Sequence, residues 1–270
     1  MRRESRKFQF DINEACRARI QVNGHTLGLR PDDIFLVSYP KSGNTWLRFL
    51  LANLLSRPPQ SFQDANNLVP DIHNARTPEM ISEVPSPRIL KSHFPFDARY
   101  PRVIYLVRDP RSVCVSQFFF KKRKGELRPE QRFEMFLDQF LDGFDDGFGD
   151  WGNHVTSWMA QDEHSPDRIT VRYEDLKADT AACLRRLCAF AGIEASESNL
   201  AEAIAHCSMD AMLRIERDTG LGQQLKGQGD LRIPFVRRGS TREWREYFTM
   251  SMDARLQNRF SAAMSLTGYA

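Results

Sequence analysis

Two short apolar runs, each followed by a turn and a helical pattern, constrain the fold of this chain more than any other feature. The runs are Ile34–Tyr39 (IFLVSY) and Arg102–Val107 (RVIYLV). Pro40, Ser42 and Gly43 separate the first run from TWLRFLLANLLS, and RDPRS separates the second from VCVSQFFFKKRK. Apolar runs of this length that alternate with helices are typical of buried parallel strands. The sequence therefore predicts an α/β fold with a central parallel sheet flanked by helices.

Two more segments extend the predicted sheet, Arg88–Phe94 (RILKSHF) and Arg168–Tyr173 (RITVRY). A helical stretch, Leu176–Ala191, follows the second, and the C-terminal third is helical apart from a glycine-rich interruption. Lys, Arg or His lies at or beside the ends of these predicted strands. Because open α/β sheets bind ligands beyond the carboxyl ends of their strands, we expect the functional site there.

The chain is predicted to form one domain. Its 270 residues would suit two small domains or one large one, but no linker, repeat or low-complexity tail divides it. We expect a single domain over residues 1–270, with residues 1–30 as an N-terminal extension. Residues 217–234 are expected to form a mobile loop, because Gly220–Gly229 (GLGQQLKGQG) is too rich in glycine to continue a helix.

Composition argues against several classes of function. A net charge of +3 is low for a duplex-binding protein, and Lys121–Lys124 is interpreted as the basic end of a helix, so no nucleic-acid partner is expected. No apolar run reaches the roughly 18 residues of a membrane span, and no signal-peptide core is present, so we expect a cytoplasmic protein. The cysteines are odd in number and lack C-x-x-C spacing, which favours reduced thiols. They are Cys16, Cys114, Cys183, Cys188 and Cys207.

The strongest local signal is Tyr39–Trp46 (YPKSGNTW) at the first strand-to-helix turn. Backbone N–H groups after Gly43, the hydroxyls of Ser42 and Thr45, and the helix dipole would converge on an anion, with Lys41 adding a positive charge. The turn is not a Walker A loop, because G-x-x-x-x-G-K-[ST] is absent. On the loop alone, a glycine turn with an exposed lysine is an equal alternative.

A second signal, Arg108–Ser116 (RDPRSVCVS), begins at the end of the next predicted strand. Arg108 can pair with a phosphate through two N–H groups, and Ser116 lies two turns into the following helix. A salt bridge from Arg108 to Asp109, or an N-cap role for Asp109, is the simpler interpretation of this segment alone.

Two further signals complete the set. Lys91 and His93 alternate along a predicted strand, so both side chains would point to one side, and His93 there can act as a general base. Arg237, Arg238 and Gly239 can together wrap a phosphate, although a solvated basic turn is the alternative. The other histidines show no metal-ligand spacing. They are His25, His73, His154, His164 and His206.

Together these motifs resemble the cytosolic-type sulfotransferases that use 3′-phosphoadenosine 5′-phosphosulfate (PAPS). YPKSGNTW resembles their 5′-phosphosulfate loop, RDPRSVCVS their 3′-phosphate segment and FVRRG their closing element, in the same order, from about Leu36 to Phe248. The resemblance implies a single α/β domain with a P-loop-like anion site, PAPS as sulfuryl donor, adenosine 3′,5′-bisphosphate (PAP) as product, and no metal. It implies a small-molecule or glycan acceptor whose hydroxyl or amine attacks sulfur in line.

The resemblance also implies residue roles. The 5′-phosphosulfate would be held by Lys41, Ser42, Gly43, Asn44 and Thr45. The 3′-phosphate would be held by Arg108, Ser116, Arg237, Arg238 and Gly239. The adenine would lie against Trp46, Tyr173, Cys207 and Met209. His93 would be the catalytic base, Lys41 and Lys91 would neutralise developing charge, and Ser116 would restrain Lys41 until the acceptor binds.

The chain departs from the family pattern at several positions. Asn44 replaces the usual threonine, Cys207 another threonine, and Met209 a phenylalanine beside the base. The family's dimer motif would fall at Arg245–Ala254, where only two of its positions fit, so the oligomeric state is left open.

Two other functions compete with this hypothesis. A P-loop-type kinase would share the strand, turn and helix, but Lys41 precedes the only glycine of the turn, and no Lys-Ser/Thr pair follows the two glycines of a magnesium-binding P-loop. A catalytically inactive nucleotide sensor is disfavoured because Lys41, Lys91 and His93 are all present. The acceptor stays open among a glycan, a phenol, an aliphatic alcohol and an amine.

Overall fold

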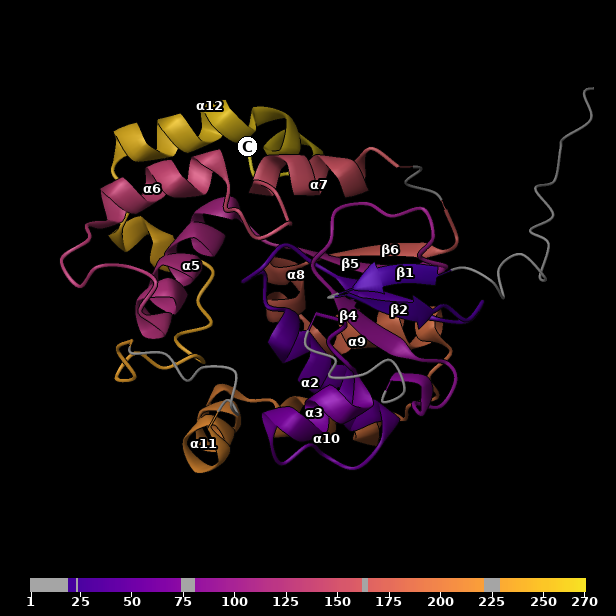
Figure 1. The fold of residues 1–270 in the computed structure, drawn as a ribbon. Helices are drawn as coiled ribbons and strands as arrows, with labels where there is room; N and C mark the ends of the chain where they lie inside the picture. The colour runs from indigo at the N-terminus through magenta and orange to yellow at the C-terminus, as the bar shows by residue number, and fades with distance from the viewer. Residues whose placement is uncertain (1–18, 23, 74–80, 162–164, 221–228) are drawn as a thin grey trace, which may run out of the picture.

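A parallel sheet of four short strands forms the centre of the molecule (Figure 1). The computed structural model describes residues 19–22, 24–73, 81–161, 165–220 and 229–270. The strands are β3 (Ile34–Val37), β4 (Ile89–Ser92), β5 (Arg102–Val107) and β6 (Arg168–Arg172), in the order β4-β3-β5-β6. All three neighbouring pairs are parallel, so the carboxyl ends of the strands lie at one edge. The predicted α/β fold with a parallel sheet is confirmed.

The side chains of the sheet alternate between two hydrophobic cores. Phe35 and Val37 of β3 pack into one core, and Ile34 and Leu36 pack into the other. Each core needs its own layer of helices, because a strand that is apolar on both faces is stable only when both are covered. All four residues are fully buried.

Helices cover both faces (Figure 1). One core takes its helical residues from α5 (Pro110–Lys124), α6 (Phe133–Asp142), α7 (Trp151–Met159) and α12 (Met250–Thr267). The other takes them from α2 (Asn44–Leu55), α3 (Phe62–Leu68), α8 (Tyr173–Ala178), α9 (Thr180–Ala191), α10 (Glu197–His206) and α11 (Met209–Thr219). A 3₁₀ helix, η2 (Glu243–Glu246), precedes α12. No helix in the described ranges is both long and apolar enough to cross a membrane.

An antiparallel hairpin, which the sequence analysis did not assign, packs on the first of these cores. Its strands are β1 (Arg19–Val22) and β2 (His25–Gly28). Beside it, Arg88 forms a buried ion pair with Asp33 at 2.6 Å and also donates to the carbonyl of Gly28 at 3.0 Å. These contacts tie the hairpin to the start of β4.

Several element boundaries differ from the sequence expectations. β3 and β4 end two residues earlier than expected, so the polar residues at their ends lie in the turns that follow. The helical stretch Leu176–Ala191 is divided at Asp179, whose side chain caps α9 by accepting from the N–H of Ala182. The centre of the expected mobile loop, residues 221–228, lies outside the described residues, as do Cys16 and His164.

Candidate active site

A cavity of about 1190 Å³ opens at the carboxyl edge of the sheet. Its wall includes every residue that the sequence analysis assigned to catalysis or nucleotide binding except Ser42, which is buried behind it. They come from β4, from the turns after β3, β4 and β5, from α2, α5 and α8, and from residues 207–209 and 237–239. Small-molecule sites usually enclose about 300–1,000 Å³, so this cavity is large enough to hold a small-molecule ligand.

The turn between β3 and α2 has a conformation that requires glycine. Gly43 precedes α2 with a φ of 98°, and a Cβ at this position would lie 2.4 Å from the Cδ2 atom of Tyr173. No side chain caps the first turn of α2, and the buried Oγ of Ser42 has no partner in the described part of the chain. The turn therefore leaves N–H groups and a hydroxyl for an anion.

Lys41 occupies the same turn with a φ of 70°, rare for a residue with a side chain. Its ammonium lies over the rings of Phe120 and Phe235, 4.0 and 4.1 Å from their centroids. Burial, and next the charges of Arg108 and Arg237, lower the pKa of Lys41 to about 7. The two rings hold the ammonium at the wall of the cavity.

Arg108 links two turns that are far apart in the sequence. Its guanidinium donates to the carbonyls of Lys41 at 3.3 Å and Ser240 at 3.0 Å, and it stacks on Tyr173 at 4.3 Å from the ring centroid. Its buried Nε has no partner among the described residues. The N-cap role that the sequence analysis gave as an alternative for Asp109 is confirmed. Its side chain caps α5 by accepting from the N–H of Arg111.

Ser116 lies on α5 and lines the cavity. No hydrogen bond joins it to Lys41 within the described ranges, where the lysine instead contacts aromatic rings. The restraint of Lys41 by Ser116, which the resemblance implies, is thus not formed in this conformation.

The two adjacent arginines near the C-terminus are held by carboxylates that the sequence analysis did not assign. Arg237 donates to both carboxylate oxygens of Glu243 at 2.7 Å, and Arg238 donates to Glu246 at 2.8 and 2.9 Å. Glu243 is buried, whereas Arg238 is 55% exposed. A phosphate can bind the exposed Arg238 with less loss of existing contacts than it would cause by binding Arg237.

The residues expected around adenine gather at one end of the cavity. The indole of Trp46 donates to the carbonyl of Cys207 at 2.9 Å and meets the ring of Tyr173 edge to face. The hydroxyl of Tyr173 donates to the carbonyl of Gly239 at 3.3 Å. A Cβ on Gly239 would lie 2.5 Å from the methyl carbon of Met209. These contacts make a flat-sided slot between aromatic rings and a thioether.

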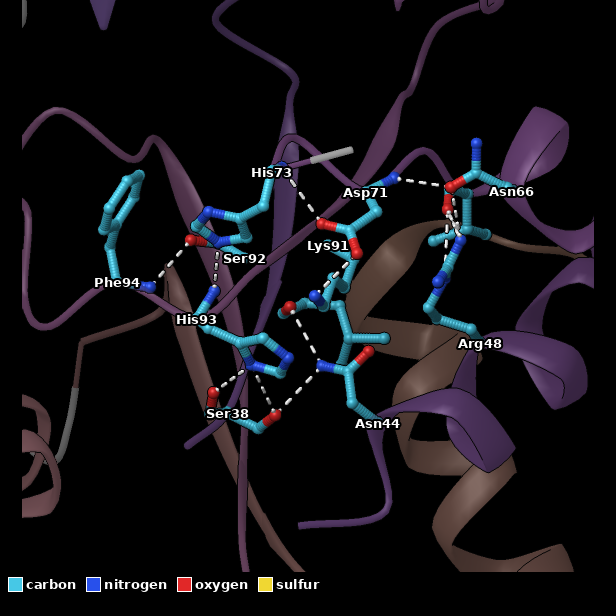
Figure 2. A network of polar contacts seen from close by, with 12 residues as sticks. Ser38, Asn44, Arg48, Asn66, Asp71, His73, Lys91, Ser92, His93 and Phe94 are labelled. Carbon is cyan, nitrogen blue, oxygen red and sulfur yellow. Dashed lines mark hydrogen bonds and ion pairs between the residues drawn. The ribbon is translucent and has the colours of Figure 1, made fainter. Parts of the chain in front are cut away.

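His93 is held in one orientation just after β4 (Figure 2). Its Nδ1 is 2.6 Å from the carbonyl oxygen of Ser38, which only accepts, so Nδ1 carries the proton and Nε2 has a free lone pair. Burial, and next the charge of Lys91, lower the pKa of His93 well below its usual value. The imidazole is therefore neutral near pH 7 and able to accept a proton at Nε2.

Lys91 does not extend freely into the cavity. Its ammonium is 2.7 Å from the Oδ2 atom of Asp71, and both side chains are buried. Burial raises the pKa of Asp71, but the charges of Lys91 and Arg48 outweigh this and leave it below its ordinary value. Burial lowers the pKa of Lys91, and the neighbouring charge of Asp71 opposes this shift.

Asp71 and His73 were not assigned by the sequence analysis, yet they contact Lys91 and His93 (Figure 2). The sequence contains one signal that could have found them: DIH at 71–73 and KSH at 91–93 each place a charged residue two positions before a histidine. The structure shows that the two segments are neighbours, because Asp71 and Lys91 form a parallel β-bridge.

Three unpartnered polar groups test whether an anionic nucleotide fits this cavity. The Oγ of Ser42, the Nε of Arg108 and the Oδ1 of Asn44 are buried without partners among the described residues. The first two are donors beside a turn that leaves N–H groups unpaired, which suits phosphate oxygens. The amide nitrogen of Asn44 donates to Ser38 and Leu36, so this side chain faces the sheet. No group of three metal-ligating side chains was found in the described part of the chain.

Comparisons with known proteins agree with this geometry. A family model described as "Sulfotransferase domain" matches residues 31–268. Sulfotransferase 2B1 of Rattus norvegicus is 30% identical over 260 residues, which cover 90% of this chain and 74% of the relative. Sulfotransferase 1E1 of Bos taurus is 28% identical over 257 residues, which cover 87% and 84%.

Solved structures share the fold. Mouse sulfotransferase SULT7A1 complexed with PAP has a TM-score of 0.68 and 24% identity, and the match covers 93% of this chain and 98% of the mouse chain. Retinol dehydratase in a complex with retinol and PAP has a TM-score of 0.65 and 22% identity, and the match covers 88% and 82%.

Proposed function

The chain belongs to the sulfotransferase family, and we propose that it transfers the sulfuryl group of PAPS to a hydroxyl or amine of a small-molecule or glycan acceptor, with His93 as base. The contacts of Arg108 carry the proposal, because this one side chain joins the turn of Lys41 to the turn of Gly239 and Ser240. Two anion-binding turns on one cavity match a ligand that carries a phosphate at each end.

We place the 5′-phosphosulfate against the N–H groups and hydroxyls of residues 42–45, beside Lys41. The 3′-phosphate lies against Arg108, Ser116 and the turn of Arg237–Gly239, and the adenine occupies the slot between Trp46, Tyr173, Cys207 and Met209. The supporting observations are the uncapped start of α2, the unpaired Oγ of Ser42 and Nε of Arg108, and the aromatic walls.

His93 is proposed to take the acceptor proton at Nε2. The hydrogen bond from Nδ1 to Ser38 fixes the tautomer, and the lowered pKa keeps the ring unprotonated before the acceptor arrives. Lys41 and Lys91 supply positive charge close to the oxygens on which charge grows. Fixed charge and positioning provide most of the acceleration, because sulfuryl transfer resembles phosphoryl transfer in having a loose transition state.

Labelled PAPS and pooled acceptors test this function. Purified protein should transfer label to at least one acceptor, and His93→Ala should lower turnover by about 10²–10⁴-fold, the usual contribution of a general base, while PAP still binds. Near-normal turnover by His93→Ala would refute the assignment of the base. Calorimetric titration with PAP and with ATP plus magnesium distinguishes a sulfotransferase from a kinase. Tighter binding of ATP with magnesium would favour a kinase.

A further inference from the structure

His73 contacts the main chain of His93. The Nε2 atom of His73 accepts the backbone N–H of His93 at 2.8 Å, and the two imidazole rings are nearly parallel with centroids 5.8 Å apart (Figure 2). His73 lies outside the segments that resemble the family motifs.

The backbone of His93 is held on its other side as well. The carbonyl oxygen of His93 lies 3.1 Å from the Nε2 atom of His154. With Nδ1 of its own ring bonded to Ser38, the base is therefore restrained at its N–H, its carbonyl and its side chain. A residue fixed at these three points has little freedom to rotate its Nε2 away from an acceptor.

Asp71 completes the arrangement by joining both partners. Its Oδ1 accepts the backbone N–H of His73 at 3.0 Å, and its Oδ2 accepts from the ammonium of Lys91 at 2.7 Å. The main chain of this segment also pairs with β4: the N–H of Lys91 donates to Pro70 at 2.8 Å, and the N–H of Ile72 donates to Lys91 at 3.1 Å. Asp71–His73 therefore lies along Lys91–His93 in parallel register.

We propose that Asp71 and His73 are positioning residues of the sulfuryl transfer: His73 sets the direction of the His93 imidazole through its backbone, and Asp71 sets the ammonium of Lys91. The inference rests on the proposed role of His93 as base. Its physical basis is the steep dependence of proton transfer on geometry, since a displacement of about 1 Å can cost about 10²-fold in rate.

The neutral form of His73 makes this contact possible. A protonated imidazole has donors at both nitrogens, so Nε2 accepts a hydrogen bond only when unprotonated. Burial, and next the charge of Lys91, lower the pKa of His73 to about 4. The acceptor is thus present throughout the neutral range.

Two substitutions of His73 separate positioning from packing. His73→Phe keeps a ring against Phe94 and Phe148 but removes the acceptor, whereas His73→Gln loses the ring and keeps an acceptor at a similar distance from the backbone. We expect His73→Phe to lower kcat by about 10²-fold, with KM and PAP affinity little changed. His73→Gln should retain most of the wild-type kcat.

The same substitutions of His25, an exposed residue of the hairpin, provide the matched control and should leave kcat and KM unchanged. If His73→Phe keeps full turnover and His73→Gln loses it, the ring packing matters and the positioning role is wrong. Equal losses in both variants, together with lower thermal stability, would also overturn it.

A double substitution distinguishes failure of this inference from failure of the proposed function. If His73 acts only through His93, adding His73→Phe to His93→Ala should not lower the residual rate further. A further loss of about 10²-fold in the double variant would mean that His73 acts independently of His93. Normal turnover by His93→Ala alone would instead refute the assigned base.

Discussion

At the scale of single residues, Lys41 combines an unusual backbone with an unusual charge. Its φ is positive, and its ammonium lies against two phenylalanine rings. Loss of hydration disfavours the charged form, and the nearby guanidinium groups disfavour it further. The lysine is thus poised between its two protonation states until an anion arrives.

This poise predicts a pH dependence of nucleotide binding. With a pKa of about 7, Lys41 is charged below pH 7 and mostly neutral above it in the free protein. A phosphate favours the charged form, so above pH 7 binding must take up a proton, and PAP affinity should fall by up to about tenfold per pH unit. Titration calorimetry from pH 6 to 8.5 measures this change in affinity. In Lys41→Arg, PAP affinity should depend less on pH, because arginine stays protonated.

A flat affinity across that range in the wild-type protein would contradict the description of Lys41. The Lys41→Arg control also detects titration of the nucleotide itself, since that contribution would persist in the variant.

At the scale of elements, the turn between β3 and α2 also shapes the adenine site. Gly43 adopts a left-handed conformation and at the same time lies against Tyr173 of α8. The backbone of Gly43 therefore lies so close to the Tyr173 ring that no side chain fits between them. The turn and the wall of the adenine slot depend on each other.

Gly43→Ala should disturb both. The backbone strain costs about 1–3 kcal/mol in folding stability, and the added methyl group must displace Tyr173, so PAP affinity should fall as well. Gly192→Ala is the matched control, because Gly192 has a φ of 71° with no atom near its Cβ position. Urea unfolding and calorimetry should show lower stability in both variants but weaker PAP binding only in Gly43→Ala. Equal PAP affinity in the two variants would contradict the contact.

The turn of Arg237–Gly239 supports a second prediction at this scale. Arg238 should exchange its exposed ion pair with Glu246 for the 3′-phosphate, so Arg238→Ala should weaken PAP binding by about tenfold. Arg232→Ala removes another exposed, carboxylate-paired arginine and should have no effect on affinity. If Arg238→Ala spares PAP affinity and changes acceptor preference, the phosphate has been placed wrongly.

Elements also show what the sequence could and could not predict. Four strands and the helices after them were predictable because their apolar runs are long enough to fill two cores. The hairpin was not, because its strands, RIQV and HTLG, contain few apolar side chains. The contacts of Asp71 with Lys91 and of Glu243 with Arg237 were also not predictable, since they depend on which segments become neighbours.

On the scale of the whole molecule, the buried ion pair of Arg88 and Asp33 joins the hairpin, β3 and β4 behind the site. Neither side chain is exposed by more than 1%, and Arg88 also donates to Gly28 and Ile81. Removing one partner leaves a buried charge without compensation. The pair therefore matters more for stability than the exposed ion pairs of the surface.

Asp33→Ala should lower the free energy of unfolding by about 3–5 kcal/mol, as measured by urea denaturation. Glu197→Ala breaks the exposed pair with Arg185 and should change stability little. A small loss in Asp33→Ala, similar to that in Glu197→Ala, would show that Arg88 keeps enough partners without the carboxylate.

The central claim is that one cavity at the carboxyl edge of the sheet holds both phosphates of the nucleotide and presents its 5′ end to His93. A crystal structure of the protein with PAP tests it most directly. We predict the 5′-phosphate at the turn of residues 42–45, the 3′-phosphate in contact with Arg108 and Arg238, and adenine against Trp46, Tyr173 and Met209. A nucleotide bound elsewhere, or bound with Arg108 and Arg238 away from its phosphates, would contradict the account.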